Sequence, residues 1–144
     1  MYLQDLNFKN RKESNKEIKY RTFAMIKPDC YLNIGKIINM IEEDGFTISN
    51  MKIARLTEQD AQQFYAEHKG KPFYNSLVEF ISSDLVVGLE LVADDCVAKW
   101  RRLLGPTSPA QAKKESPNSI RAKFGKEGVQ NAAHGSDSPA SAVR

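Results

Sequence analysis

The densest group of chemically capable side chains in the sequence lies in the segment 131–138, NAAHGSDS. There His134 follows small apolar residues and precedes a glycine and three oxygen-bearing side chains. A neutral imidazole is a good nucleophile near pH 7, and it can form a covalent intermediate that divides one hard transfer into two easier ones. Gly135 would let a bulky group approach the backbone closely. Taken alone, the segment also fits a structural or merely exposed histidine, because only a positioned partner makes an imidazole catalytic.

Cationic side chains form the second candidate group, namely Lys27, Arg101, Arg102 and Arg121. Phosphoryl transfer needs charge placed against phosphate oxygens, and arginine supplies it through bidentate contacts. The sequence has neither a GxxxxGK(S/T) loop nor a GxGxxG turn, so a phosphate site would have to be built from side chains. Each of these cations, taken singly, also fits an ordinary surface residue.

The third group combines Tyr65 with Phe73 and Leu77. An exposed aromatic ring could stack a nucleobase. Aromatic residues at helical spacing usually pack inward, so the same three residues also fit a hydrophobic core.

Four strands are predicted to position these groups. The apolar run 23–26 ends at a lysine before Pro28, as a short buried strand would. Residues 46–56 are β-branched and partly alternating, and 85–91 read as a central strand. A last short strand is expected around 132–134.

Helices are predicted from apolar residues that recur at helical spacing. The stripes are Ile34, Ile37, Ile38 and Ile41; Ala61, Phe64, Tyr65 and His68; Phe73, Leu77, Phe80 and Ile81; and Val97, Trp100 and Leu104. Candidate caps are Asn33, the near capping box of Thr57 with Asp60, Asp94 or Asp95, and Gly45 at a C-terminus. The segment 105–118 holds three of the six prolines and is expected to be a long surface loop.

The resulting order, β-α-β-α-α-β-α-loop-β, predicts an α+β fold. We expect a ferredoxin-like α/β sandwich with a four-stranded antiparallel sheet covered by helices. The 144 residues suit one domain, assigned to 21–144, preceded by a flexible or partner-bound basic arm over 1–20.

Composition excludes several classes of protein. Hydrophobic residues make up 41% and charged residues 27%, as in a soluble globular chain. No apolar run approaches the ~20 residues that cross a bilayer, and the start lacks the apolar region of a secretory signal, so no membrane association is expected. Cys30 and Cys96 form no CxxC pair or metal cluster, which favours a reduced intracellular setting.

The net charge of +3 is weak evidence for nucleic acid. Much of the excess lies in the arm, which fits either a solvated charged segment or a docking tail for an acidic partner. No aromatic and basic residues alternate along the chain as a single-strand binder would require, so a nucleic-acid partner is not expected.

Five segments of the chain together resemble nucleoside diphosphate kinases. In order, they are RTFAMIKPD, KPFYNSL, LLGPTSP, SIRAKFG and NAAHGSDS, and the resemblance covers residues 21–144. DDCVAKWRRLLGP, SIRAKFG and NAAHGSDSPASA are most similar to the group II, axonemal type, nucleoside diphosphate kinase seven. The resemblance also implies that the family's C-terminal segment is missing after Arg144.

The resemblance implies a ferredoxin-like fold and a ping-pong exchange through a phosphohistidine. His134 would carry the γ-phosphoryl group from a nucleoside triphosphate such as ATP to a nucleoside diphosphate, with Mg²⁺ bridging the phosphates. Direct metal ligation by the protein is not expected, with Asp137 a candidate outer ligand.

The remaining roles are also carried over from the family by position. Lys27 would lie near the transferred phosphate and the sugar, Tyr65 beside the histidine, and Ser136 would orient the ring. The other expected nucleotide-binding residues are Phe73 for the base with Leu77 flanking it, Arg101, Thr107 and Arg121 for the β- and γ-phosphates, and Asn131 for the ribose.

The same resemblance leads to two expectations about cellular role. The first is a cytoplasmic kinase, with a homo-oligomer as a candidate assembly. The alternative is a structural component of a ciliary or axonemal microtubule assembly that retains the kinase-like fold with weak or no activity. In that role the arm would bind microtubule or axonemal proteins, and a cilium or flagellum axoneme would be the location.

Overall fold

The computed structural model describes residues 20–135. Four antiparallel strands form one sheet in the order β2-β3-β1-β4. They are β1 (Arg21–Ile26), β2 (Thr47–Arg55), β3 (Leu85–Val92) and β4 (Ala133–Gly135). The predicted ferredoxin-like α+β fold with a four-stranded antiparallel sheet is therefore confirmed.

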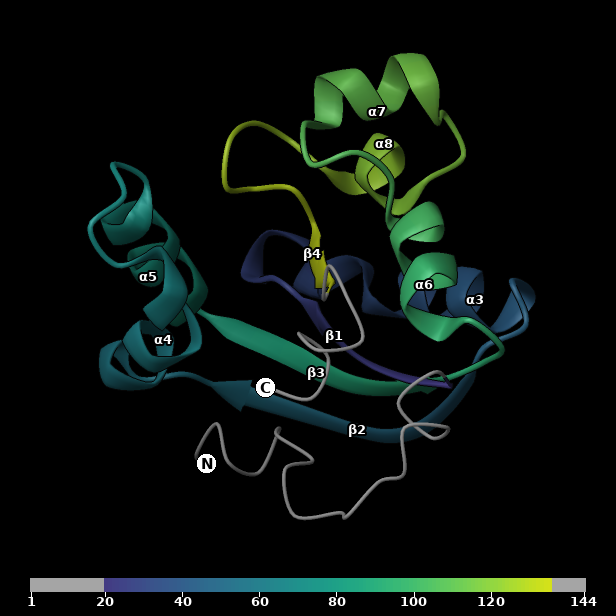
Figure 1. Ribbon diagram of the computed structural model, residues 1–144, viewed down its shortest axis with the longest axis horizontal. Helices are drawn as coiled ribbons and strands as arrows, with labels where there is room; N and C mark the ends of the chain where they lie inside the picture. The colour runs from purple at the N-terminus through teal and green to yellow at the C-terminus, as the bar shows by residue number, and fades with distance from the viewer. Residues whose placement is uncertain (1–19, 136–144) are drawn as a thin grey trace.

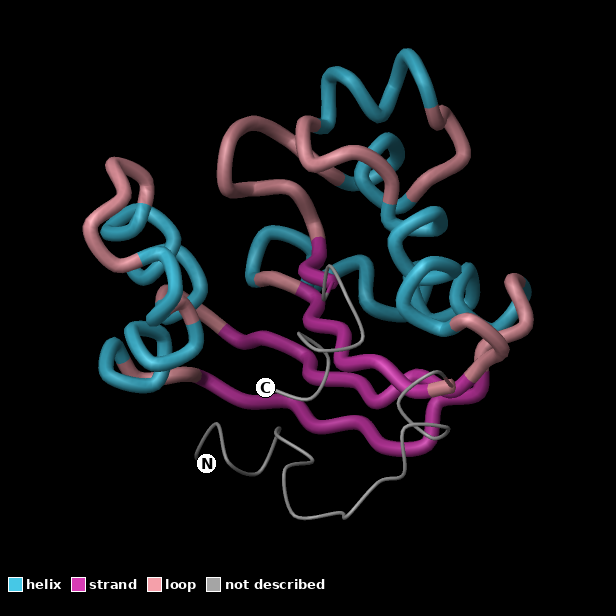
Figure 2. The backbone as a smooth tube through the Cα atoms, viewed as in Figure 1, coloured by secondary structure: helices cyan, strands magenta, loops and turns pink. Residues whose placement is uncertain are grey.

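The helices gather into two groups on either side of β4 (Figure 1). One group is α3 (Ile34–Glu43), α6 (Cys96–Leu104), α7 (Pro109–Glu115) and α8 (Ile120–Phe124), with the short helix η1 (Pro28–Asn33) leading into α3. The other is α4 (Glu58–Phe64), η2 (Ala66–His68) and α5 (Tyr74–Ser82), which projects from the ends of β2 and β3 (Figure 2).

Two hydrophobic clusters hold these groups to the sheet. Trp100 of α6 and Ile37 of α3 pack with Leu89 of β3 in the larger cluster. Met25 of β1 and Ile81 of α5 belong to the smaller one, under the α4–α5 hairpin. Alternation along β1 and β3 sends neighbouring side chains to opposite faces of the sheet, so each strand serves both clusters.

Two predicted caps are confirmed in full, and two stand at the predicted N-cap positions without the capping hydrogen bond. Thr57 and Asp60 form a reciprocal capping box at α4, and Gly45 ends α3 with a positive φ of 88°. Asn33 and Asp95 stand at the N-cap positions of α3 and α6 but make no capping side-chain hydrogen bond. Asp95 is in the left-handed region, where its carboxylate does not accept from the first turn.

The prediction of a long surface loop over 105–118 is also wrong in part, because α7 occupies its centre. The Ser108 hydroxyl accepts a hydrogen bond from the Gln111 amide, and Pro109 occupies the first turn. Proline is favoured there because the first amides of a helix have no partner inside it. No helix in the range 20–135 is long and apolar enough to cross a membrane. The predicted arm lies almost wholly outside the described residues.

Candidate active site

His134 lies in the middle of β4, between the two groups of helices. Its strand pairs with β1 at Met25, and its carbonyl accepts a hydrogen bond from the Trp100 indole at 3.3 Å. Gly135 lets α6 come this close, since a Cβ there would lie 2.6 Å from the Trp100 Nε1. The histidine backbone is therefore fixed from both sides, while its side chain is only half-buried.

The imidazole meets aromatic rings on one side. Phe64 lies edge-on with its centroid 5.1 Å away, and Tyr65 lies edge-on at 6.4 Å. Burial, followed by the positive charges of Lys27, Arg121 and Arg101, lowers the pKa of His134 to about 3. The ring is therefore neutral near pH 7, with a lone pair free to act as a nucleophile.

Lys27 follows β1 directly and is buried beside the last loop. Its Nζ donates to Asn131 Oδ1 at 2.8 Å and to the Val129 carbonyl at 3.3 Å. Burial lowers the pKa of Lys27 to about 8, with Arg121 adding to the effect and Asp29 opposing it. A buried ammonium without a strong counter-ion is stabilised by an anionic ligand.

Arg121 crosses the interior from α8 and ties three segments together. Its guanidinium donates to the carbonyls of Asn131, Gly105 and Ala133, at 3.3, 3.0 and 3.0 Å. Burial and the neighbouring Arg101 lower the pKa of Arg121 to about 10. The side chain still carries its positive charge at neutral pH, next to the histidine strand.

Arg101 and Asn131 complete the polar wall. Arg101 is exposed on α6, with its guanidinium 3.5 Å from the Gly135 carbonyl. The buried Asn131 amide donates to the Thr107 carbonyl at 3.1 Å, which ties the last loop to the α6–α7 connection. Thr107 is itself exposed at that connection.

An aromatic surface on the α4–α5 hairpin faces this wall. Phe73 is 45% exposed just before α5, so the prediction that its ring is available for stacking fits the structure. Tyr65 is 3% exposed and Leu77 is half-buried, both within the smaller cluster, so their packing role is real. Burial raises the pKa of Tyr65, whose buried hydroxyl has no hydrogen-bond partner among the described residues.

Two site residues were not singled out for chemistry from the sequence. The His68 ring lies 6.0 Å from the Tyr65 ring and 5.6 Å from that of Phe73, and its Nδ1 is 3.1 Å from Lys71 Nζ. The Asp29 carboxylate accepts from the Ala132 amide at 3.1 Å, and burial raises its pKa. The only signal in the sequence was their place inside the HKGKPF and KPD segments.

The sequence-predicted residues thus come together from distant parts of the chain. Lys27, Arg101, Arg121 and Asn131 lie around His134, and Phe73 lies on the facing hairpin. Arg102, a candidate cation, instead lies at a pocket between α6 and the loop 116–119. Ser136 and Asp137 lie outside the described residues, so their predicted roles remain predictions.

The side chains around His134 offer few ligands for Mg²⁺ itself. No cluster of three or more histidine, cysteine or acidic residues suited to a metal occurs within residues 20–135. Around His134 the named charges are cations, which repel a bare divalent ion and attract phosphate. A magnesium ion at this site would therefore be held through bound phosphates, with Lys27, Arg101 and Arg121 against the phosphate oxygens.

Comparisons with known proteins point in one direction. The family model described as nucleoside diphosphate kinase matches residues 20–144. A nucleoside diphosphate kinase of Desulfotalea psychrophila is 44% identical, over 85% of this chain and 89% of that protein. The rat protein named nucleoside diphosphate kinase homolog 7 is 45% identical over 88% of this chain. The match covers 32% of that rat protein, so the chain spans about a third of its length.

Solved structures agree with these sequence matches. The nucleoside diphosphate kinase of Aquifex aeolicus superposes with a TM-score of 0.83 and 42% identity, over 85% of this chain and 89% of that one. A halophilic nucleoside diphosphate kinase from Halobacterium salinarum, solved in complex with CDP, superposes with a TM-score of 0.76 and 36% identity, over 83% and 78%. With the family model matched over residues 20–144, we conclude that the chain belongs to the nucleoside diphosphate kinase family.

Proposed function

We propose that this chain is a phosphotransferase that exchanges γ-phosphoryl groups between nucleoside triphosphates and diphosphates through a phosphohistidine at His134. One observation carries the proposal: a neutral, half-buried imidazole lies among cations from α6, from α8 and from the residue that follows β1. Family membership supports the same activity.

The first half-reaction attacks the γ-phosphorus with a ring nitrogen of His134. A bond forms between nitrogen and phosphorus while the bond to the β,γ-bridging oxygen breaks, and the nucleoside diphosphate leaves with that electron pair. In the second half-reaction a terminal oxygen of another nucleoside diphosphate attacks the phosphohistidine and restores the neutral ring. A covalent intermediate of this kind divides one transfer between two bound nucleotides into two separate steps.

The surrounding residues would stabilise charge and hold the nucleotide. Lys27, Arg101 and Arg121 would lie against phosphate oxygens, where preorganised positive charge acts most strongly on the transition state. Phe73 would stack any base, which fits broad nucleotide specificity, and Asn131 would face the ribose. Bound Mg²⁺ supplies further charge neutralisation on the phosphates.

Labelling with γ-³²P-ATP tests the proposal. The wild-type chain should acquire acid-labile, alkali-stable label, and His134→Ala should acquire none. Because the chain has only two histidines, His68→Gln is the matched control and should retain label. Absence of label on the wild type, or equal label on His134→Ala, contradicts the proposal.

A second candidate function is a structural role in a ciliary or axonemal microtubule assembly. It is favoured by the 45% identity to nucleoside diphosphate kinase homolog 7 and by the basic arm over 1–20. Deleting the arm should abolish binding to axonemal microtubules and leave nucleotide binding intact. Unchanged binding after the deletion would count against the arm as the anchor. The kinase hypothesis goes with a cytoplasmic location, and the structural hypothesis goes with a location in the axoneme.

We also propose a homo-oligomer formed through the β2 edge. β2 ends the sheet order among the described strands, and Met51 and Ile53 on it are 47% and 48% exposed. An edge strand with exposed apolar side chains is a ready surface for pairing with a second copy. No role in membrane or nucleic-acid binding is proposed.

A further inference from the structure

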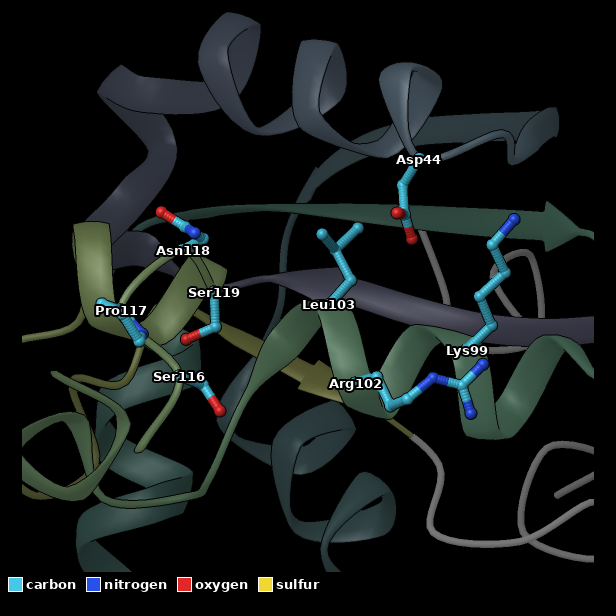
Figure 3. A pocket seen from close by; sticks show the side chains of 8 residues that line it. All are labelled: Asp44, Lys99, Arg102, Leu103, Ser116, Pro117, Asn118 and Ser119. Carbon is cyan, nitrogen blue, oxygen red and sulfur yellow. The ribbon is translucent and has the colours of Figure 1, made fainter. Parts of the chain in front are cut away.

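A pocket lies between α6 and the loop that precedes α8. Its volume is about 370 Å³, and Lys99, Arg102 and Leu103 of α6 line it on one side (Figure 3). Ser116, Pro117, Asn118 and Ser119 line it on the other, with Asp44 at the end of α3. Arg101, between Lys99 and Arg102 in the sequence, is turned instead to the Gly135 carbonyl, so α6 separates this pocket from the nucleotide site.

The pocket lies in the most basic part of the described chain. Residues 96–126 carry eight lysines and arginines against a single glutamate. Arg101 and Arg121 belong to the proposed nucleotide site, which leaves six cations outside it. Lys113 and Lys114 are exposed in the last turn of α7, and Glu115 separates them from the pocket residue Ser116. Phosphoryl transfer at His134 therefore does not account for these six positive charges.

We propose that the surface formed by α6, the end of α7 and the loop 116–119 binds an acidic polypeptide segment of a partner protein. Arg102, Lys113 and Lys114 attract the segment's carboxylates, and Lys99 lies half-buried at the pocket wall with its ammonium over the Phe46 ring. Charge complementarity of this kind speeds association and selects the partner.

The mixed chemistry of the lining favours a peptide over a phosphate polymer. Asp44 and the serine hydroxyls accept hydrogen bonds, and a peptide offers an N–H donor at nearly every residue, whereas a sugar–phosphate backbone offers mostly acceptors. Leu103 adds an aliphatic contact. Within 20–135 the one exposed aromatic side chain, Phe73, lies on the α4–α5 hairpin, so this surface has no ring on which bases could stack.

Fluorescence anisotropy of the full chain with a labelled peptide of alternating glutamate and glycine tests the proposal. Binding should weaken with salt, and Arg102→Glu should lower the affinity about fivefold or more, as for an ion pair at a surface. Lys36→Glu, an equal charge change at an exposed position near the start of α3, should leave it unchanged. A melting curve for each variant confirms that it folds.

Three outcomes would overturn the inference. One is equal loss of binding in Arg102→Glu and Lys36→Glu, which would indicate that peptide binding depends only on the overall charge of the chain. A second is displacement of the peptide by ATP, which would place it in the nucleotide site. The third is tighter binding of a single-stranded oligonucleotide of equal charge with the same dependence on Arg102, which would assign the surface to nucleic acid.

Discussion

Lys27 is buried and His134 half-buried, and the pKa values of both are lowered by desolvation and by the nearby charge of Arg121. The consequences differ because their ordinary pKa values lie on opposite sides of neutrality. His134 is held neutral, as a nucleophile requires. Lys27, with a pKa of about 8, stays mostly charged at pH 7 but loses its proton at mildly alkaline pH.

We therefore expect triphosphate affinity to fall as the pH rises through about 8, because the anion binds the charged form of Lys27. Lys27→Met should bind ATP about tenfold or more weakly at pH 7, as expected for a lost charge-assisted hydrogen bond. Its affinity should also be flat between pH 7 and 9. Calorimetry at constant ionic strength measures both, with Lys36→Met as the control; an unchanged slope in Lys27→Met contradicts the assignment.

The lowered pKa of His134 predicts how stability depends on pH. Between the folded value of about 3 and the ordinary value near 6.5, the unfolded chain binds a proton at this site that the native chain does not. Lowering the pH through that window destabilises the native state, by up to about 1.4 kcal/mol per pH unit for one proton.

In His134→Gln this contribution disappears. Urea unfolding from pH 7.5 to 4.5 should show the wild type losing stability relative to the variant, starting below about pH 6.5. Parallel curves for the two proteins would mean that the ring is as well solvated in the native state as in the unfolded chain.

At this scale the sequence predicts candidate groups better than it predicts their surroundings. His134, Lys27 and Arg121 are singled out because phosphoryl transfer needs a nucleophile and cations, and the structure brings the three together. His68 and Asp29 were missed because a ring contact or a lone carboxylate leaves no periodic signal. Arg102 is a candidate that lies elsewhere. Residue type alone does not tell which of the adjacent Arg101 and Arg102 faces His134.

Among the elements, β4 and α6 depend on each other through a glycine. A methyl group at Gly135 would lie 2.6 and 2.7 Å from Nε1 and Cδ1 of the Trp100 indole. The indole is fully buried and donates to the His134 carbonyl, so it cannot move without disturbing the histidine.

Gly135→Ala should therefore lose about 1–3 kcal/mol of stability, as in other overpacked cores. It should also lower the rate of phosphohistidine formation. Denaturant unfolding and single-turnover labelling measure the two effects. Gly35→Ala is the matched control, because nothing lies within 4 Å of its added methyl and alanine is the better helix former. Equal behaviour of the two variants would remove the steric argument.

The prediction of secondary structure is wrong where capping residues, and not apolar periodicity, define a helix. The strands and α3–α6 follow apolar periodicity and were found. α7 is not predicted because the three prolines between 105 and 118 indicate a loop, although Ser108 and Pro109 are good helix-starting residues. Its buried face is short, with Pro109 and Ala112, so periodicity gave no signal.

Across the whole molecule, charge and exposed apolar surface are separated. The α6–α8 side carries most of the excess of cations, whereas Met51 and Ile53 expose apolar surface on β2, at the far edge of the sheet from β4. The two surfaces can serve different partners at the same time. An acidic segment on one and a second copy of the chain on the other would leave the nucleotide site open.

The proposed self-association through β2 makes a prediction at this scale. In a two-fold dimer the same strand contributes from each copy, so one substitution acts twice. Ile53→Glu should raise the dimer dissociation constant at least about tenfold, since an apolar side chain buried at an interface is worth about 1.5–3 kcal/mol. Ile53→Val keeps an apolar, β-branched side chain and should preserve the dimer.

Sedimentation velocity over a range of concentrations distinguishes monomer from dimer. Phosphohistidine formation should persist in Ile53→Glu, because His134 is on β4, at the opposite edge of the sheet. A chain that sediments as a monomer at every concentration, or a dimer indifferent to both substitutions, would show that β2 is not the interface.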